Sequence, residues 1–326
     1  MPHICRFSSA SSSSSSVRVS VILHNWFRKC FTRIRKCFLL YVCVMIDQRI
    51  AIIGGTGKFG RHLGKRLDEE NKVVISGSNI KDAERVAEDH DWGYGKNKDV
   101  VKDADVVIVA VPVSVTEDVI HEVGPHVPDD ALFTDITSVK QGPVEAMSKY
   151  SDQVLGMHPM YAPSNSIKGQ NVALCPESGK KWTVMEEFWK DHGAHVTVTD
   201  PEEHDRAMSL VQGLMHFSEL VLADVIRKSD LSDDDAKEYS TPIYSILTDL
   251  TARMLNQSPS LYRSIQAENP ENEEVRQKFI ESAEEISELV DDPEEFNERF
   301  EEMGEEFELG ESQKRSDELI EHLSSL

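Results

Sequence analysis

A glycine-rich turn between an apolar run and an amphipathic segment constrains the fold of this chain more than any other feature. In RIAIIGGTGKFGRHLGKRLDEE the β-branched run ends at the turn, and apolar side chains then recur every four residues, as on one face of a helix. Gly55, Gly57 and Gly60 form the pattern G-x-G-x-x-G. In that pattern the first glycine permits a tight turn, the second lets a pyrophosphate approach the backbone, and the third lets the helix approach the strand. Because the pattern lies between a strand and a helix, it predicts a dinucleotide-binding unit.

Strand-like and helix-like segments alternate after this turn. KVVISG, ADVVIVAVPV and ALFTDIT read as strands with helical segments between them, and QVLGMHP, NVALCP and HVTVTD read as three further strands. Strands that alternate with helices predict a doubly wound parallel sheet, which binds its ligand at the carboxyl ends of the strands. We therefore expect an α/β domain of the Rossmann type over residues 45–200.

The periodicity changes at Asp200. Pro201 suits the first position of a helix and Asp200 suits its cap, so DPEEHDRAMSLVQGLMHFSELVLADVIRKSD is predicted to form one long helix. The rest of the sequence is also helical in pattern and strongly acidic. These features predict an all-α C-terminal domain over residues 201–326.

Three polar side chains share one face of that predicted long helix. At about 100° per residue, Asp205, Gln212 and His216 fall on the same side, with Met208 close to them. We interpret Met208 as a core residue. A glutamine and a histidine among apolar neighbours need polar partners if they are buried, so this face predicts a shared site or a polar network.

The first 44 residues differ in composition from the remainder. They contain four of the five cysteines, seven of the 35 basic residues and none of the 58 acidic residues. The serine run with scattered arginines superficially matches an organelle transit peptide, and the apolar run 38–46 is too short to span a bilayer. We favour Met45 as the true start and exclude residues 1–44 from the fold, as a non-structural leader or a mis-assigned start.

Without that segment the chain carries a net charge of −30, which would repel nucleic acid and anionic membranes. Two interpretations of the acidity remain: ordinary solvated faces, or adaptation to a salt-rich cytoplasm, where ions screen the self-repulsion. We favour adaptation to salt, because the acidic excess runs through the whole body of the chain. Only Cys175 remains there, and no H-E-x-x-H or Cys/His spacing occurs, so we predict neither a disulfide framework nor a metal site.

The cofactor preference depends on the end of the second predicted strand, where an acidic side chain would bind the ribose 2′-hydroxyl of NAD. In ISGSNIKDAER that position carries no carboxylate. Ser76, Ser78 and Asn79 could instead donate to a 2′-phosphate, and Lys81 or Arg85 could supply positive charge. The pattern favours NADP and leaves NAD open, because hydroxyl side chains also bind NAD. The residues predicted to contact the dinucleotide are Gly55, Thr56, Gly57, Lys58, Phe59, Gly60, Ser78, Asn79, Val111 and Pro112.

Several stretches together resemble the prephenate dehydrogenases of tyrosine biosynthesis. They are IIGGTGKFG, TDITSVK followed by GMHPMYAP, and DPEEHDRAMSLVQGLMHF, and LTARMLNQSPSLYRSIQAENP resembles the family segment that binds the substrate carboxylate. The resemblance covers residues 49–305 in the same order. One local departure is Tyr161-Ala162-Pro163, where the family often has an aromatic residue followed by Gly-Pro.

The resemblance implies the oxidative decarboxylation of prephenate to 4-hydroxyphenylpyruvate, with hydride transfer to NAD(P). His158 is the implied catalytic residue, since a neutral imidazole can take the hydroxyl proton near physiological pH. We expect Pro159 to hold His158 in a loop at the strand ends. Ser138 resembles the family serine that bonds the same hydroxyl or the histidine. The alternatives are a loop histidine bonded to the backbone and a serine that caps the next helix.

The substrate bears two carboxylates and therefore needs cations. Arg253 matches the family arginine that binds the carboxylate on the ring, for which a bidentate guanidinium is suited, and a surface ion pair is the alternative. By resemblance His216 lines the substrate pocket, to which we also assign Gln212, and His204 shapes the junction between the domains. Lys140 either contacts substrate or cofactor or is exposed.

The resemblance also implies the assembly of the protein. Such dehydrogenases pair through their helical domains, so we expect residues 201–326 to bind substrate and to form a homodimer. We expect a monofunctional cytoplasmic enzyme with no nucleic-acid or membrane partner.

Three rival functions stay open. Arogenate dehydrogenase performs the same chemistry on an amino analogue of the substrate. A β-hydroxyacid dehydrogenase shares the two-domain plan but uses a lysine of its helical domain, and His158 argues against it. The third rival is a non-catalytic NADP-sensing regulator.

Overall fold

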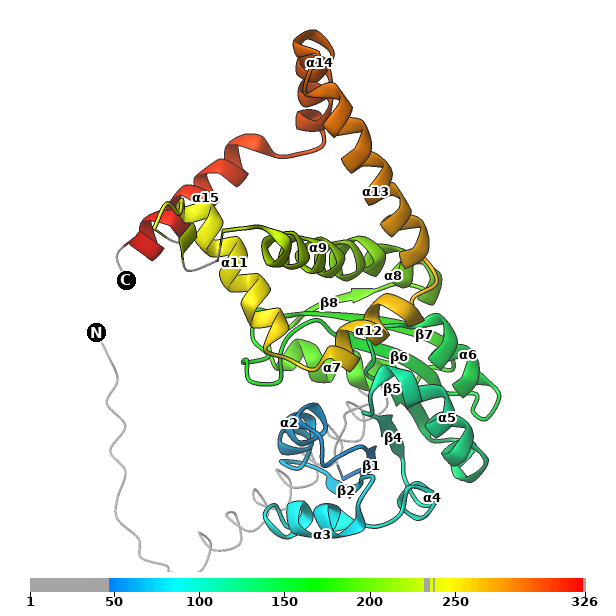
Figure 1. Cartoon of the computed structure of the whole chain (residues 1–326). Helices are drawn as coiled ribbons and strands as arrows, with labels where there is room; N and C mark the ends of the chain where they lie inside the picture. Colours follow the sequence, from blue (N-terminus) through cyan, green and yellow to red (C-terminus); the bar gives the residue numbers. More distant parts are fainter. Residues whose placement is uncertain (1–46, 232–234, 237, 325–326) are drawn as a thin grey trace, which may run out of the picture. The chain divides into compact units, whose positions relative to one another are not determined.

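The computed structural model describes residues 47–231, 235–236 and 238–324, so the expected leader over residues 1–44 lies outside them (Figure 1). The strands are β1 (Arg49–Ile53), β2 (Lys72–Ser76), β3 (Gly93–Tyr94), β4 (Val106–Val109), β5 (Leu132–Asp135), β6 (Val154–Pro159), β7 (Asn171–Ser178) and β8 (His195–Val198). The helices among them are α2 (Lys58–Leu67), α3 (Ile80–Glu88), α4 (Asn97–Val100), α5 (Val113–Val123), the short η1 (Gly124–His126), α6 (Gln141–Ser148) and α7 (Thr183–Asp191).

Helices make up the described chain after β8. They are α8 (Pro201–Met208), the π-helix η2 (Ser209–Leu214), α9 (Met215–Lys228), α11 (Pro242–Leu255), α12 (Pro259–Glu268), α13 (Asn272–Leu289), α14 (Pro293–Glu305) and α15 (Leu309–Ser324). Asp200 caps α8, because its carboxylate accepts the backbone N–H of Glu203 at 2.9 Å. The expected fold class, a doubly wound sheet followed by helices, is confirmed.

The eight strands form one sheet in the order β3-β2-β1-β4-β5-β6-β7-β8. Every pair is parallel except β6 and β7, which are antiparallel, so the expectation of a fully parallel sheet needs correction. A parallel return requires a long crossover, usually a helix. Residues 160–170, which connect β6 to β7, contain no helix, and the chain therefore returns beside β6 in the opposite direction.

The centre of the sheet is buried on both faces. All four residues of β4 are buried, as are the last four of β1, which is typical of a parallel sheet covered by helices. Apolar side chains of α5 and α6 join those of β1, β4 and β5 in one buried cluster on one face. The strand order reverses between β1 and β4, so their carboxyl ends form the crevice in which such sheets bind ligands.

The glycine turn differs in one detail from its sequence pattern. The left-handed residue is Gly54, with φ of 83°, whereas we expected Gly55 to make the tight turn. A Cβ on Gly54 would lie 2.4 Å from the carbonyl oxygen of Ala110, and a Cβ on Gly60 would lie 2.5 Å from the carbonyl oxygen of Gly54. Gly54 and Gly60 therefore let β1, β4 and α2 approach one another. Gly57 caps α2 without a side-chain hydrogen bond, which leaves the first N–H groups of the helix for an anion.

We predict that Gly54→Ala lowers the free energy of unfolding by at least about 1 kcal/mol more than Gly169→Ala. Both glycines have left-handed φ angles, 83° and 79°, so alanine strains both backbones by about 1–2 kcal/mol. Only Gly54 adds a clash, since a Cβ at Gly169 would meet nothing within 4 Å. Urea unfolding of the two variants measures the difference, and equal losses would contradict this account of the turn.

Candidate active site

His158 lies within β6, one residue before the end of the strand, and not in a loop as expected from its proline neighbour. It pairs in register with Ala173 of β7, and Pro159 pairs with Val172. A proline is tolerated at a strand end, where its missing N–H breaks no further ladder bond. Only 4% of His158 is exposed, so the strand holds its imidazole in a buried position.

A chain of hydrogen bonds runs from His158 to a buried carboxylate. His158 Nδ1 lies 3.0 Å from His204 Nε2, and His204 Nδ1 lies 2.7 Å from Asp205 Oδ1. A carboxylate accepts only, so His204 donates through Nδ1, and a neutral His204 then accepts through Nε2. His158 must donate through Nδ1, which leaves the lone pair of His158 on Nε2. The relay fixes both the ring orientation and the tautomer that a general base needs.

The surroundings of His158 keep its imidazole neutral. Burial lowers the pKa of His158 well below its usual value of 6.5, and the nearby Lys140 cation lowers that pKa further. The Nε2 atom is therefore unprotonated at neutral pH and can accept a proton.

Asp205 is fixed by two backbone donors as well as by His204. Its Oδ1 accepts the N–H of Lys140 at 2.8 Å, and its Oδ2 accepts the N–H of Gln141 at 3.0 Å. These donors stand at the start of α6, where the unpaired N–H groups of a helix favour a negative charge. The carboxylate thus joins α8 to the segment after β5 and aligns the relay with β6.

Lys140 is neither exposed nor free. Its Nζ lies 2.5 Å from Asp135 Oδ2 and donates to the carbonyl oxygen of Met157 at 2.9 Å, and both side chains of the ion pair are fully buried. Thr137 also donates to Asp135 through its N–H at 2.8 Å. The pair links the end of β5 to Met157, the residue that precedes His158, and so helps to hold His158 in place. The sequence TDITSVK contained both charges, but not their pairing.

Gln212 is the second predicted site residue that reaches the relay. Its Nε2 lies 3.4 Å from His158 Nε2, which suits an amide that donates toward the imidazole lone pair. Gln212 belongs to η2, a π-helical turn inside the segment that we expected to form one uniform helix. His216 instead packs its ring against Tyr262 of α12 at 4.9 Å between centroids, and its Nδ1 has no hydrogen-bond partner within the described chain.

Ser138 and Arg253 make no contact with His158 among the described interactions. Ser138 is half-buried between β5 and α6, and its Oγ has no hydrogen-bond partner there. It does not cap α6, because Lys140 occupies that position. Arg253 is exposed on α11 and forms no ion pair with any described residue. Both side chains are therefore available to a polar ligand, and their assigned roles stay predictions.

A cavity of about 260 Å³ lies at the carboxyl ends of β1 and β4, where the strand order places the ligand crevice. Of the predicted cofactor contacts, Thr56, Gly57, Ser78, Val111 and Pro112 line the cavity. Gly77, Ala110 and Asn97 also line it and were not predicted, because only the folded sheet brings them to the turn. Open glycine backbone beside the uncapped start of α2 fits a pyrophosphate.

The other predicted cofactor contacts lie beside the cavity and not in its lining. Gly55 and Gly60 serve close packing, and Lys58 begins α2. The Asn79 side chain accepts the N–H of Lys81 at 2.9 Å and caps α3. Ser76 is fully buried at the end of β2, so Ser78 is the hydroxyl at the tip of that strand that faces the cavity.

Sequence reasoning missed an aromatic contact between α2 and the segment after β6. His62 Nε2 lies 3.2 Å from the hydroxyl of Tyr161, and the Phe59 ring lies 5.5 Å from the Tyr161 ring. Phe59 therefore packs against the residues that follow His158. Tyr161 directly precedes Ala162, the residue at which the sequence departs from the usual family pattern.

Among residues 47–231, 235–236 and 238–324, no group of three or more His, Cys, Asp or Glu side chains is placed to hold a metal ion. Cys175 is a free, buried thiol. Burial raises the pKa of the Cys175 thiol to about 12, so it is not a thiolate ligand or nucleophile.

Two family models match the chain in sequence order. The model of the prephenate dehydrogenase nucleotide-binding domain matches residues 63–198, and the model of the prephenate dehydrogenase dimerization domain matches residues 200–309. The first match begins inside α2, after the glycine turn. The resemblance seen in the sequence is therefore confirmed.

Curated relatives agree with these matches. "Probable arogenate/prephenate dehydrogenase" of Methanocaldococcus jannaschii is 37% identical over 251 residues, which cover 74% of this chain and 56% of that protein. The "T-protein" of Enterobacter agglomerans is 31% identical over 222 residues, which cover 66% of this chain and 55% of that protein. The chain thus spans about half the length of these curated relatives.

Two solved structures share the fold. Prephenate dehydrogenase from A. aeolicus, in complex with hydroxyphenyl propionate and NAD+, has a TM-score of 0.67 and 23% identity, covering 79% of this chain and 96% of that one. Synechocystis arogenate dehydrogenase has a TM-score of 0.63 and 15% identity, covering 79% of this chain and 98% of that one. At these identities the likeness supports the fold alone.

We predict that His158 is neutral at pH 6.5 and carries its proton on Nδ1. Because its pKa is lowered, the ring binds a second proton only as the pH falls below 6.5. Nitrogen NMR of the labelled protein measures the tautomer and the midpoint, and the His158→Gln variant identifies the resonance by its loss. A midpoint at or above 6.5, or a proton on Nε2 of the neutral ring, would contradict the relay.

Proposed function

The chain belongs to the prephenate dehydrogenase family, and from this premise we propose that it oxidatively decarboxylates prephenate or arogenate. The observation that carries the proposal is the relay at the end of β6. It presents a neutral, buried His158 with its lone pair on Nε2, at the same edge of the sheet as the dinucleotide cavity. A base in that position suits the oxidation of a hydroxyl beside a bound nucleotide.

In the proposed reaction, His158 Nε2 accepts the proton of the substrate hydroxyl as the carbinol carbon becomes a carbonyl. The nicotinamide, when bound, supplies the acceptor for the hydride that leaves that carbon. Carbon dioxide departs from the ring, and the proton returns from His158 to the phenolate oxygen as the ring becomes aromatic. The hydrogen bonds from His158 through His204 to Asp205 stabilise the transient imidazolium.

Cations and free polar groups would hold the substrate. We assign Arg253 to the ring carboxylate, since its guanidinium has no carboxylate partner among the described residues of a strongly acidic protein. Ser138 is assigned to the reacting hydroxyl, because its Oγ is buried and lacks a partner in the described chain. Gln212 is assigned to the same hydroxyl, and His216 to the pocket wall.

The cofactor is assigned to the cavity at the glycine turn, with NADP favoured over NAD. The tip of β2 presents Ser78 and Asn79 in place of a carboxylate, and both are exposed. Lys81 is exposed nearby and forms no ion pair within the described chain, whereas Arg85 lies 3.5 Å from Asp82. The A. aeolicus protein was solved with NAD+, so NAD remains the alternative for this chain.

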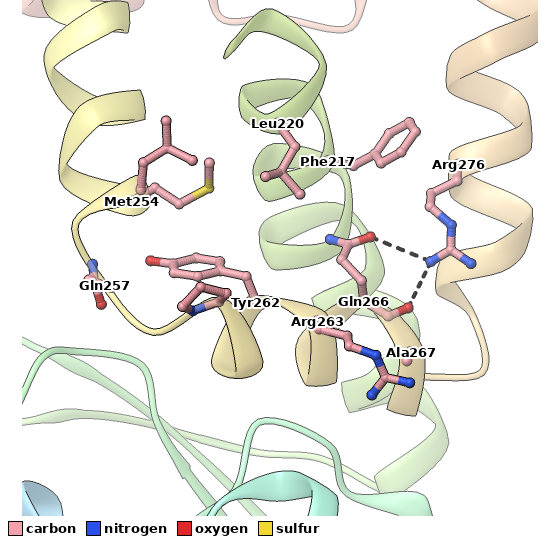
Figure 2. A pocket seen from close by; sticks show the side chains of 11 residues that line it. Phe217, Leu220, Met254, Gln257, Tyr262, Arg263, Gln266, Ala267 and Arg276 are labelled. Atoms are coloured by element: carbon pink, nitrogen blue, oxygen red, sulfur yellow. Dashed lines mark hydrogen bonds between the residues drawn. The ribbon is translucent and has the colours of Figure 1, made fainter. Parts of the chain in front are cut away.

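We infer that the helical part forms a homodimer, which would cover its apolar surface. The helical stretch Pro201–Lys228 is long and apolar enough to span a membrane by length and composition. An 18-residue window within it has a mean hydropathy of 1.3, and only 11% of that window is buried. The matched family domain is described as a dimerization domain, which favours a partner subunit over a membrane. An apolar cavity of about 480 Å³ also opens between α9, α11 and α12 (Figure 2). Large exposed apolar side chains on α9 and α11 include Leu220, Val225, Ile243, Leu247, Leu250 and Leu255.

A cytoplasmic homodimer without nucleic-acid partners agrees with the net charge of −30 outside the first 44 residues. Adaptation to salt stays a prediction. A non-catalytic NADP sensor is disfavoured, because nucleotide binding alone gives no reason for a buried relay that ends in an unprotonated imidazole.

The decisive assay offers prephenate and arogenate, each with NAD and NADP, to the protein in concentrated potassium chloride while reduced nicotinamide absorbance is followed. We expect turnover with one of the two substrates. His158→Asn should lower turnover by about 10² to 10⁴, the usual contribution of a general base.

His195→Asn is the matched control, since His195 is exposed at the start of β8, and it should leave turnover unchanged. If folded protein that binds nucleotide shows no turnover with any of the four substrate and nucleotide pairs, the proposed function is overturned. Full activity of His158→Asn would remove His158 from the mechanism.

A further inference from the structure

We propose that Gln266, Asn269 and Asn272 are positioning residues that hold the π-turn η2 in the register that brings Gln212 to His158. The three side chains come from α12, from the residue that follows it and from the start of α13, outside the relay. This inference rests on the proposed function for its kinetic test and adds to it a second layer of residues.

The π-turn sets the angle between the two polar groups of the long helix. Asp205 precedes the turn and is fixed to α6, whereas Gln212 lies within it and faces His158. A π-turn contains one more residue than an α-turn, so relaxing it to α would rotate the later residues by roughly 100° relative to Asp205. Such a rotation would carry the Gln212 amide away from His158. The register is therefore a requirement of the site and needs something to hold it.

Two side-chain amides donate to backbone carbonyl groups, one before the turn and one near its end. Asn269 Nδ2 donates to the carbonyl oxygen of Asp205 at 2.8 Å, and Gln266 Nε2 donates to the carbonyl oxygen of Gly213 at 2.8 Å. π-turns are rare and leave the regular ladder of helix bonds disturbed, so donors from outside the helix can decide whether one persists. The first carbonyl belongs to α8, before the turn, and the second to the last part of the turn itself.

The amide of Gln266 is itself oriented. Arg276 of α13 donates through Nη1 to the main-chain oxygen of Gln266 at 2.7 Å and lies 3.4 Å from its Oε1, as Figure 2 shows. Because Oε1 faces a cation, the Nε2 end must face the other way, toward Gly213. Arg276 therefore selects the amide orientation that the turn requires.

Asn272 brings α13 against the turn at a position where only glycine fits. A Cβ on Gly213 would lie 2.1 Å from Asn272 Oδ1 and 2.8 Å from its Cγ. Asn272 is 1% exposed and donates through Nδ2 to the carbonyl oxygen of Ile265 at 2.7 Å, which anchors it to α12. Its Oδ1 has no hydrogen-bond partner in the described chain and rests on the glycine. Asn272 therefore cannot move away from Gly213 without losing its hydrogen bond to Ile265.

The test is Gly213→Ala, which should push α13 off the turn and lower kcat about three- to tenfold, the effect of one lost neutral hydrogen bond. Gln212→Ala should cause a similar loss. The double variant should be no slower than Gln212→Ala, because both changes remove the same contact. Gly304→Ala in α14 is the matched control, since its Cβ would meet only Leu309 Cδ1 at 3.7 Å, and its kcat should equal that of the unaltered protein.

The proposal would be overturned if the kcat of the double variant were lowered by the product of the two single effects. A kcat of Gly213→Ala within twofold of that of the unaltered protein would also overturn it. If Gly213→Ala does not fold, Gln266→Met removes the same grip and enters the same cycle. A second readout does not need turnover: Gly213→Ala should shift the nitrogen NMR resonance of His158 Nε2 as Gln212→Ala does. If the unaltered protein is inactive with every substrate, the proposed function fails, and the NMR resonance of His158 Nε2 alone tests the inference. A resonance that does not shift in Gly213→Ala would then overturn it.

Discussion

The carboxylate of Asp205 is the constraint on which the rest of the site depends. It accepts hydrogen bonds from the backbone N–H groups of Lys140 and Gln141 and from the imidazole N–H of His204. The carboxylate is fully buried, so these three donors take the place of water. A buried charge without such donors would cost several kcal/mol. These hydrogen bonds fix α8 to the start of α6. Through His204, the same carboxylate determines which nitrogen of His158 carries a proton.

A second buried charge pair sets the electrostatics around that carboxylate. Lys140 and Asp135 are both fully buried, and removing one partner from such a pair typically costs about 3–5 kcal/mol because the other charge is left unpaired. Burial and this cation both oppose protonation of His158. The two charge clusters together give a histidine that is neutral by environment and oriented by hydrogen bonds, which is what a proton acceptor requires. Gln266 and Arg276, which lie outside the relay, also line the apolar cavity between α9, α11 and α12.

The sequence predicted those features that short-range rules control. The alternation of strands and helices, the glycine turn and the cap at Asp200 follow from periodicity and local backbone chemistry, and the structure contains each of them.

Local rules failed where contacts between distant segments determine the conformation. A side chain is excluded at Gly54 because Ala110, the residue after β4, is so close, and His158 stays in a strand because β7 pairs with it. The π-turn was invisible to a uniform helical spacing, since its donors lie more than fifty residues later in the chain. Contacts from Ser138, Arg253 and His216 to a substrate stay predictions, because they concern a ligand and not the chain.

A direct test of the relay compares the rate of hydride transfer in Asp205→Asn with that in the unaltered protein, at saturating substrate and nucleotide. An asparagine has nearly the same shape, but its NH2 group cannot accept a hydrogen bond and must face either Gln141 or the pair Lys140 and His204. The variant also lacks the negative charge that stabilises an imidazolium at His158 through His204. The account predicts a rate about 10² to 10⁴ lower, with unchanged affinity for the nucleotide. An undiminished rate in folded protein would show that His158 needs no relay and would contradict the account.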